Sequence, residues 1–220
     1  MNEQKLREIL EEFMLKVVAL LEEYTSEGAA PSQPDLPLEP RVDTDVLAEL
    51  VSHEGIVLEA YKDSKGIWTW GIGVTDNSGH RVGRYKDKPQ TLSKVLEIFE
   101  WLVRTKYLPA VERAFTRPLT KEQLAAALSF HYNTGGINKA SWVKSFNAGN
   151  DELARKQIMN WRSPPEIIPR RKAERDLFFD GEWSGDGTAT LYTKVNKPSY
   201  SPKWSSATKV NIREELDKWA

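Results

Sequence analysis

The sequence predicts an α+β protein, in which one small antiparallel sheet is combined with a mainly helical body. The prediction rests on three stretches. Residues 61–83 mix glycines and turn residues with β-forming residues, which indicates short strands joined by tight turns. Residues 92–115 carry an apolar stripe at helical spacing. Residues 120–134 begin with a capping box and run into a pair of glycines, which is typical of a complete helix.

The first 44 residues differ from the rest of the chain. Residues 1–24 predict an amphipathic helix whose apolar positions are spaced alternately by four and three. Those positions are Leu6, Leu10, Phe13, Val17, Leu20 and Tyr24. Residues 25–44 contain a proline at every third position from Pro31 to Pro40, the period of polyproline II. We interpret this stretch as a semi-rigid spacer, with a ligand for a proline-binding module as the alternative.

The body of the protein is predicted to extend over residues 45–183. It starts with a short helix over residues 45–54, which Gly55 ends in the left-handed conformation. Pro109 is expected to kink or divide the long helix that follows the sheet. Further helices are expected from Asn150, as a cap, to near Trp161, and over residues 170–179.

Residues 184–220 are predicted to form a C-terminal extension. They contain a strand-like segment, a loop around Trp204 and a last short helix.

Composition narrows the class of function. The 220-residue chain has no cysteine, which excludes disulfides and thiolate metal sites. Residues 1–40 carry nine acidic and three basic side chains, although the net charge of the whole chain is −1. The remaining body is therefore mildly basic, which suits an anionic polymer such as bacterial cell wall, and we expect no nucleic-acid partner. The eight tryptophans are expected mainly in the core, with sugar-stacking platforms as the alternative.

Glu54, Asp63 and Thr69 are the candidate catalytic residues. Cleavage of a glycosidic bond needs a proton donor for the leaving oxygen and a carboxylate on the other side of the sugar, without a metal or cofactor. Glu54 is expected at a helix end, where backbone carbonyls favour the protonated acid. Asp63 is expected in a solvated turn that keeps it ionised, and the Thr69 hydroxyl on the next strand is placed to hold a water.

These three residues and their surroundings resemble the signature of the phage-type lysozymes, glycoside hydrolase family 24. In that signature eight residues separate the glutamate from the aspartate and five separate the aspartate from the threonine, as they do between Glu54, Asp63 and Thr69. The neighbouring residues that match are Gly55, Tyr61, Lys62, Gly66, Gly71 and Gly73. One position departs from the pattern, because Val74 stands where many members have a histidine, and His80 is the candidate to compensate.

The resemblance extends over residues 45–183 and implies a two-lobed fold with a cleft between the lobes. It implies that Asn133 is a cleft amide and that Arg170 or Arg171 approaches Glu54. Trp68 and Trp70 alternate with Thr69 on their strand and are therefore expected to be packing residues.

The implied activity is hydrolysis of peptidoglycan between N-acetylmuramic acid and N-acetylglucosamine. Glu54 would protonate the glycosidic oxygen, and Asp63 with Thr69 would activate water on the opposite face, which implies inversion. Two alternatives remain. One is a lytic transglycosylase, which needs no water-activating aspartate; the other is a structural or wall-binding virion component.

The expected location is the host cytoplasm, followed by action on the wall after release, or else the virion. The acid-rich start resembles no signal peptide, and stable membrane insertion is not expected. Residues 1–24 are expected to self-associate or to bind a virion protein.

Overall fold

The computed structural model describes Lys16 and residues 42–217. Residues 40–220 belong to one compact unit. Apart from Lys16, the predicted helix over residues 1–24 lies outside the described residues, and so does the proline spacer up to residue 41. In the part of the chain that the structure describes, no helix is long and apolar enough to cross a membrane.

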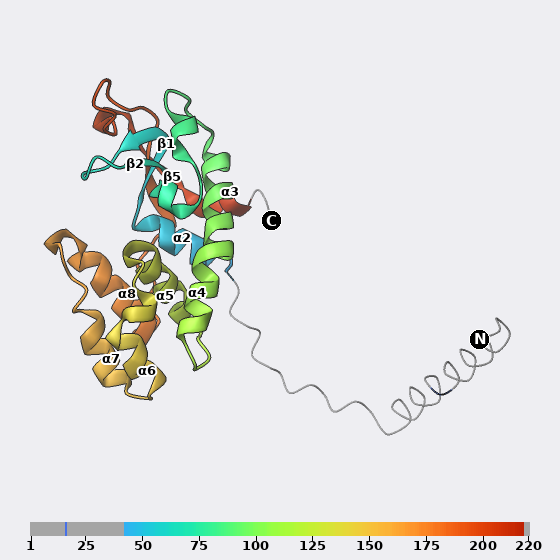
Figure 1. Cartoon of the computed structure of the whole chain (residues 1–220), viewed down its shortest axis with the longest axis vertical. Helices are drawn as coiled ribbons and strands as arrows, with labels where there is room; N and C mark the ends of the chain where they lie inside the picture. Colours follow the sequence, from blue (N-terminus) through green and yellow to red (C-terminus); the bar gives the residue numbers. More distant parts are fainter. Residues whose placement is uncertain (1–15, 17–41, 218–220) are drawn as a thin grey trace, which may run out of the picture. The chain divides into compact units, whose positions relative to one another are not determined.

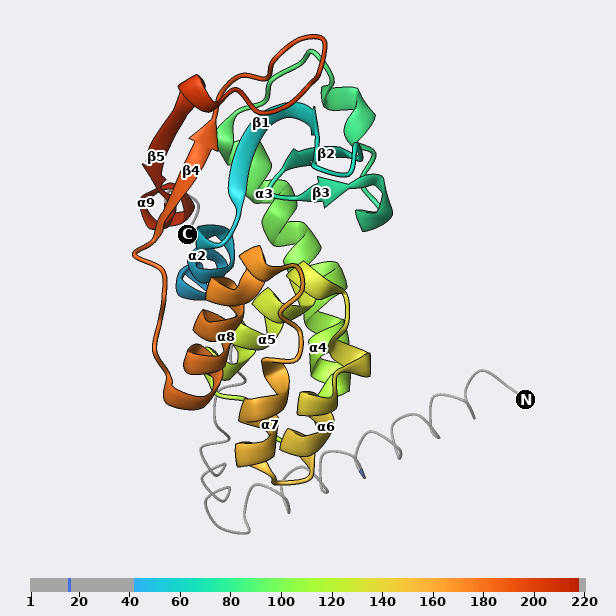
Figure 2. The same ribbon diagram turned by 90° about the vertical axis from the view of Figure 1, so that its left-hand side faces the viewer.

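The unit has two lobes, which confirms the predicted α+β class (Figure 1). One lobe surrounds a sheet and the other consists of packed helices (Figure 2). Helices α3 (Leu92–Leu102) and α4 (Leu108–Ala114) run in line along both lobes and connect them. Every residue between these two helices, Val103–Tyr107, is in a π-helical turn. Pro109 has no N–H to continue the α-helical ladder, so the predicted division of the long helix at this proline is confirmed.

The sheet has five strands in the order β3-β2-β1-β4-β5. Their bounds are Gly55–Lys62 for β1, Trp68–Gly71 for β2, Val74–Thr75 for β3, Thr188–Tyr192 for β4 and Ala207–Asn211 for β5. Strands β1, β2 and β3 form the antiparallel sheet that the sequence predicts. Strand β4 adds to the other edge of β1 in parallel, and β5 pairs antiparallel with β4. The complete sheet is therefore mixed, because the C-terminal extension supplies two of its strands.

Helix α2 (Thr44–Ser52) begins where the Asp43 side chain accepts a hydrogen bond from the Val46 N–H at 3.1 Å. Its residues from Val46 to Val51 are all buried between the sheet and the helical lobe. The predicted end of this helix at a left-handed Gly55 is wrong. Gly55 has no positive φ, and it starts strand β1 instead.

The helical lobe is centred on α5 (Lys121–Thr134), whose residues from Leu124 to His131 are buried. The predicted capping box is confirmed, with the Thr120 hydroxyl and the Gln123 side chain each accepting the other's backbone N–H. Gly135 ends the helix at φ 62°, a conformation that favours glycine. The other helices of the lobe are α6 (Ser141–Asn147), α7 (Asp151–Ile158) and α8 (Ile168–Asp180).

The C-terminal extension shares the hydrophobic core of the body. Ala189 and Leu191 of β4 are buried in that core. The last described helix, α9 (Ile212–Asp217), adds Ile212 and Leu216 to it. Residues 184–217 are thus packed on the same core as helix α2, which precedes the catalytic candidate Glu54.

We expect Ile212→Ala to lower the free energy of unfolding by about 2–5 kcal/mol, because it leaves a cavity in a fully buried site. Urea titration followed by far-UV circular dichroism measures the change. Thr208→Ala, at an exposed position of β5, is the control and should change stability by less than about 0.5 kcal/mol. Equal stabilities of the two variants would contradict a shared core.

Candidate active site

Glu54 lies at the junction between helix α2 and strand β1, just beyond the helix end. Its backbone N–H donates to the Val51 carbonyl at 2.9 Å, so the helix fixes the position from which the side chain leaves. The Glu54 side chain is 22% exposed. A Cβ at the next residue, Gly55, would be in van der Waals contact with the Tyr192 ring of strand β4, at 3.4 Å.

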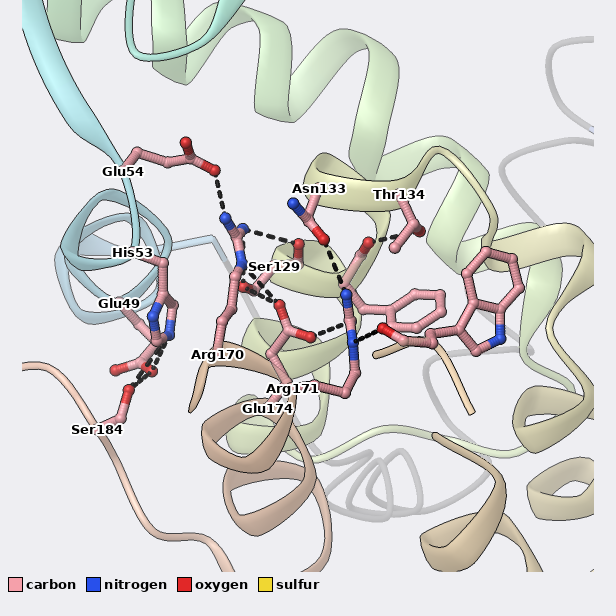
Figure 3. Close-up of polar contacts among 12 residues, drawn as sticks. Glu49, His53, Glu54, Ser129, Asn133, Thr134, Arg170, Arg171, Glu174 and Ser184 are labelled. Atoms are coloured by element: carbon pink, nitrogen blue, oxygen red, sulfur yellow. Dashed lines mark hydrogen bonds and ion pairs between the residues drawn. The ribbon is translucent and has the colours of Figure 1, made fainter. Parts of the chain in front are cut away.

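Arg170 of helix α8 forms an ion pair with the Glu54 carboxylate (Figure 3). The sequence left open whether Arg170 or Arg171 approaches Glu54, and the structure assigns Arg170. Its side chain is only 8% exposed. The sequence predicted that Glu54 lies near the backbone carbonyls of a helix end. The structure adds a guanidinium in direct contact with the carboxylate, which that prediction did not include.

A buried carboxylate, Glu174, lies between the two arginines. It accepts hydrogen bonds from Arg170 Nε at 2.9 Å and from the Ser129 hydroxyl at 2.7 Å, and it pairs with Arg171. Arg170 also donates to the backbone carbonyl of Ser129 at 3.1 Å. Two guanidinium groups and two carboxylates thus form one network from Glu54 into the helical lobe (Figure 3).

Arg171 and Asn133 are joined in the same network. Arg171 is fully buried, and its Nη2 donates to Asn133 Oδ1 at 2.8 Å. Its Nε donates to the Trp161 carbonyl at 3.0 Å, and its guanidinium lies 4.5 Å from the centre of the Phe130 ring. Arg171 therefore contacts protein groups and holds the Asn133 amide by its oxygen.

Asp63 and Thr69 lie in the hairpin between β1 and β2. Asp63 Oδ1 accepts the backbone N–H groups of Lys65 at 2.8 Å and Ile67 at 2.9 Å, and its Oδ2 has no hydrogen-bond partner among the described residues. The Thr69 hydroxyl donates to the Ile67 carbonyl at 3.1 Å. Thr69 is 3% exposed and pairs across the hairpin with Tyr61.

The negative charge of Glu54 acts on three tyrosines. Burial raises the pKa values of Tyr61, Tyr107 and Tyr132, and the negative charge of Glu54 raises each of them further. For Tyr61 the charge of Asp63 adds to that of Glu54. The Tyr61 phenol therefore senses the negative charge of both candidate carboxylates.

Behind Glu54, helix α2 is tied to the C-terminal extension by a buried carboxylate. Glu49 is 2% exposed and accepts hydrogen bonds from Ser184 Oγ and from the Gly185 N–H at 3.0 Å. His53 Nε2 lies 3.2 Å from Glu49 Oε1 and 3.2 Å from Ser184 Oγ (Figure 3). A Cβ on Gly185 would stand 2.9 Å from the hydroxyl oxygen of Ser52, so a larger residue here would displace the Ser52 side chain.

The predicted packing role of the strand tryptophans holds for Trp70, which is fully buried and donates from its ring nitrogen to the Leu58 carbonyl at 3.0 Å. His80, the candidate to compensate for Val74, stacks on Trp70 at 6.0 Å and lies 2.7 Å from the Tyr85 hydroxyl. It therefore packs against the sheet.

Sequence reasoning missed the carboxylate that organises the network and the hydroxyl beside it. Glu174 stands four residues after Arg170 and three after Arg171, a spacing that places both arginines beside it on one helix. That spacing could have predicted an ion pair between Glu174 and the two arginines. No comparable pattern pointed to Ser129, which comes from another helix.

The chain is similar to known proteins of one family. The family model for phage lysozyme matches residues 51–174. The endolysin of Salmonella phage P22 is 26% identical over 148 residues, which cover 63% of this chain and 98% of that protein. The endolysin of Acyrthosiphon pisum secondary endosymbiont phage 1 is 28% identical over 137 residues, or 57% of this chain and 89% of that protein. The solved endolysin of Escherichia coli O157:H7 phage FAHEc1 is 25% identical with a TM-score of 0.59, covering 65% of this chain and 96% of that one.

The chain belongs to the phage lysozyme family. It is accordingly an endolysin-type enzyme that degrades peptidoglycan. The matched stretch contains Glu54, Asp63, Thr69, Asn133 and Arg170 and ends before strand β4.

The contacts of Glu49 predict a pH dependence of stability. Burial acts to raise the pKa of this carboxyl, but hydrogen bonds from His53, Ser184 and Gly185 outweigh it and lower the pKa below the ordinary 4.5. In the window below about pH 4.5 the unfolded chain binds a proton before the folded chain does, so stability falls as the pH falls. Glu49→Gln removes this contribution, and the stability difference from wild type should shrink from pH 7 to pH 3.

Thermal unfolding at a series of pH values measures that difference. Glu97→Gln, in an exposed pair with Lys94, is the matched control and should show little change. A difference between wild type and Glu49→Gln that is constant from pH 7 to pH 3 would exclude the proposed cause.

Proposed function

We propose that the enzyme is an inverting muramidase, which hydrolyses the β-1,4 bond between N-acetylmuramic acid and N-acetylglucosamine. The proposal is carried by the different surroundings of two carboxylates, Glu54 and Asp63. Glu54 is held from the helical lobe by Arg170, and Asp63 is held by backbone N–H groups in the hairpin. Cleavage by inversion requires such a pair, one for the leaving oxygen and one for water.

Glu54 is the proposed general acid. Its side chain is partly exposed, so that it can reach a glycan in the cleft. Arg170 positions the Glu54 carboxyl through their ion pair. Arg170 also pairs with Glu174, which is 1% exposed and offsets part of the positive charge of the guanidinium.

Asp63 and Thr69 are the proposed water-handling groups. Asp63 Oδ1 is fixed by two backbone N–H groups, so Oδ2 is the oxygen left to accept a proton from water. The Thr69 hydroxyl donates to Ile67, and its remaining lone pair is available to accept a hydrogen bond from the same water.

Asn133 is the proposed contact for the substrate. Arg171 occupies its amide oxygen, so the amide NH₂ group is the part that remains for a glycan oxygen. Arg171 serves here as a positioning residue.

Glu54→Gln should lower the rate of peptidoglycan cleavage by at least about 10²-fold, because the amide keeps the size of the side chain and loses the proton. Clearing of purified cell walls, followed by turbidity, measures the rate. Glu97→Gln makes the same chemical change on an exposed face of α3 and should cleave like wild type. A Glu54→Gln variant that clears walls at nearly the wild-type rate would show that the acid is another residue.

Asp63→Asn should also be severely impaired, since an amide does not accept the proton of water, and Thr69→Val should be impaired less. Asp76→Asn is the control, because Asp76 also accepts a backbone N–H in a turn, from Val82 at 2.8 Å. NMR of fresh product should show the α anomer. A β anomer as first product would exclude inversion, and a 1,6-anhydro product would identify a lytic transglycosylase.

A further inference from the structure

The strands of the C-terminal extension continue a face of the sheet that includes Gly55, the residue after Glu54. In β4, Ala189 and Leu191 point into the core, so Thr188, Thr190 and Tyr192 lie on the opposite face. Thr190 pairs with Gly55 on one side and with Lys209 of β5 on the other. Residues paired in this way share a face, so Lys209 lies two strands away from the residue that follows Glu54.

A pocket of about 460 Å³ opens beside Arg170. Ser52, His53 and Arg170 form part of its polar wall. The extension adds the polar side chains of Ser184, Asp186, Thr188 and Lys209. The volume is within the range of about 300–1,000 Å³ that is usual for small-ligand sites. Arg170 links the pocket to Glu54, because its guanidinium pairs with that carboxylate.

Tyr192, at the end of β4, and Trp204, in the turn before β5, form an aromatic pair. Trp204 is 77% exposed, and the Tyr192 ring meets it edge-to-face at 5.7 Å and 88°. Tyr192 in turn packs against Gly55, at 3.4 Å from its Cβ position. An indole held by a neighbouring ring and left open to solvent suits stacking on the apolar face of a sugar ring.

The charge of the extension complements an anionic polymer. Residues 187–210 contain four lysines and no acidic residue. Lys197 pairs with Glu59 and Asp87. Lys194, Lys203 and Lys209 have no carboxylate oxygen within 4 Å among the described residues, although the charge of Lys209 helps to lower the pKa of Asp186. Asp186, the acidic group in the pocket wall, is held by the Thr188 N–H at 2.8 Å and the Thr188 hydroxyl at 2.7 Å.

We propose that strands β4 and β5, with the turn at Trp204, form a second glycan-binding surface that reaches the pocket beside Arg170. Trp204, held in place by the Tyr192 ring, stacks on an N-acetylated sugar ring, and the pocket beside Arg170 takes hydroxyl and amide groups of the glycan strand. Lys209 attracts a carboxylate of the stem peptide. The inference rests on the proposed muramidase function, and both strands and Trp204 lie outside the residues that match the family, 51–174.

The test measures binding in the Glu54→Gln chain, so that the probe is not consumed. The probes are purified peptidoglycan, by co-sedimentation, and the N-acetylglucosamine hexamer, by calorimetry. Adding Trp204→Ala should weaken binding of both probes by roughly 5- to 10-fold, as expected for an aromatic anchor. Trp204→Phe should retain most of the affinity. Trp101→Ala removes another exposed tryptophan, on α3, and should leave binding unchanged.

Lys209→Ala should weaken binding of peptidoglycan, which carries stem peptides, and leave binding of the hexamer unchanged. Lys144→Ala, at an exposed position of α6, is the matched control. In the active chain Trp204→Ala should raise KM by the same factor as the loss of affinity and leave kcat unchanged. Circular dichroism and the melting temperature verify that each variant folds.

The inference is overturned if Trp204→Ala binds both probes like its parent while wild type cleaves the wall and Glu54→Gln does not. That result leaves the proposed function intact. If Glu54→Gln still cleaves, the acid assignment fails instead, and the change in KM that Trp204→Ala causes in the active chain decides the inference.

Discussion

The carboxylate of Glu174 is almost completely buried between two guanidinium groups, and the geometry of the cleft depends on it. A buried charge is tolerated only if it is paired and hydrogen-bonded, and here Arg170, Arg171 and Ser129 satisfy it. Removal of one partner from such a group costs about 3–5 kcal/mol, a large part of a typical total stability of about 5–15 kcal/mol. The same pairing directs Arg170 to Glu54 and Arg171 to Asn133, so one interaction orients both the proposed general acid and the proposed substrate contact.

A second buried carboxylate, Glu49, attaches helix α2 to the C-terminal extension. Its partners Ser184 and Gly185 come from the segment between α8 and β4, which crosses from the helical lobe back to the sheet (Figure 2). Glu54 is therefore placed between two buried polar networks, one from α8 and one from the extension. Residues beyond the family match, such as Ala189 and Ile212, are accordingly buried in the same core as those within it.

Local sequence patterns predicted much of the fold. The capping box at Thr120, the cap at Asn150 and the disturbance at Pro109 all act within one or two helical turns, and each is found where it was expected. Gly55 failed as a helix end, because the turn after α2 is made by His53 and Glu54, and the glycine serves a close contact with Tyr192. That contact comes from a strand more than 130 residues later in the chain, and no local pattern contains it.

The sequence by itself determined the class of protein, because Glu54, Asp63 and Thr69 lie within 16 consecutive residues. Their spacing can therefore be recognised without knowing which distant segments contact them. It also placed an arginine pair near the acid. Only the tertiary structure decided which arginine meets Glu54, because helix packing brings Arg170 toward the cleft and turns Arg171, its neighbour in the same helix, into the core. It likewise decided that the extension completes the sheet, since strand pairing over such a separation depends on which edge of β1 the rest of the fold leaves open.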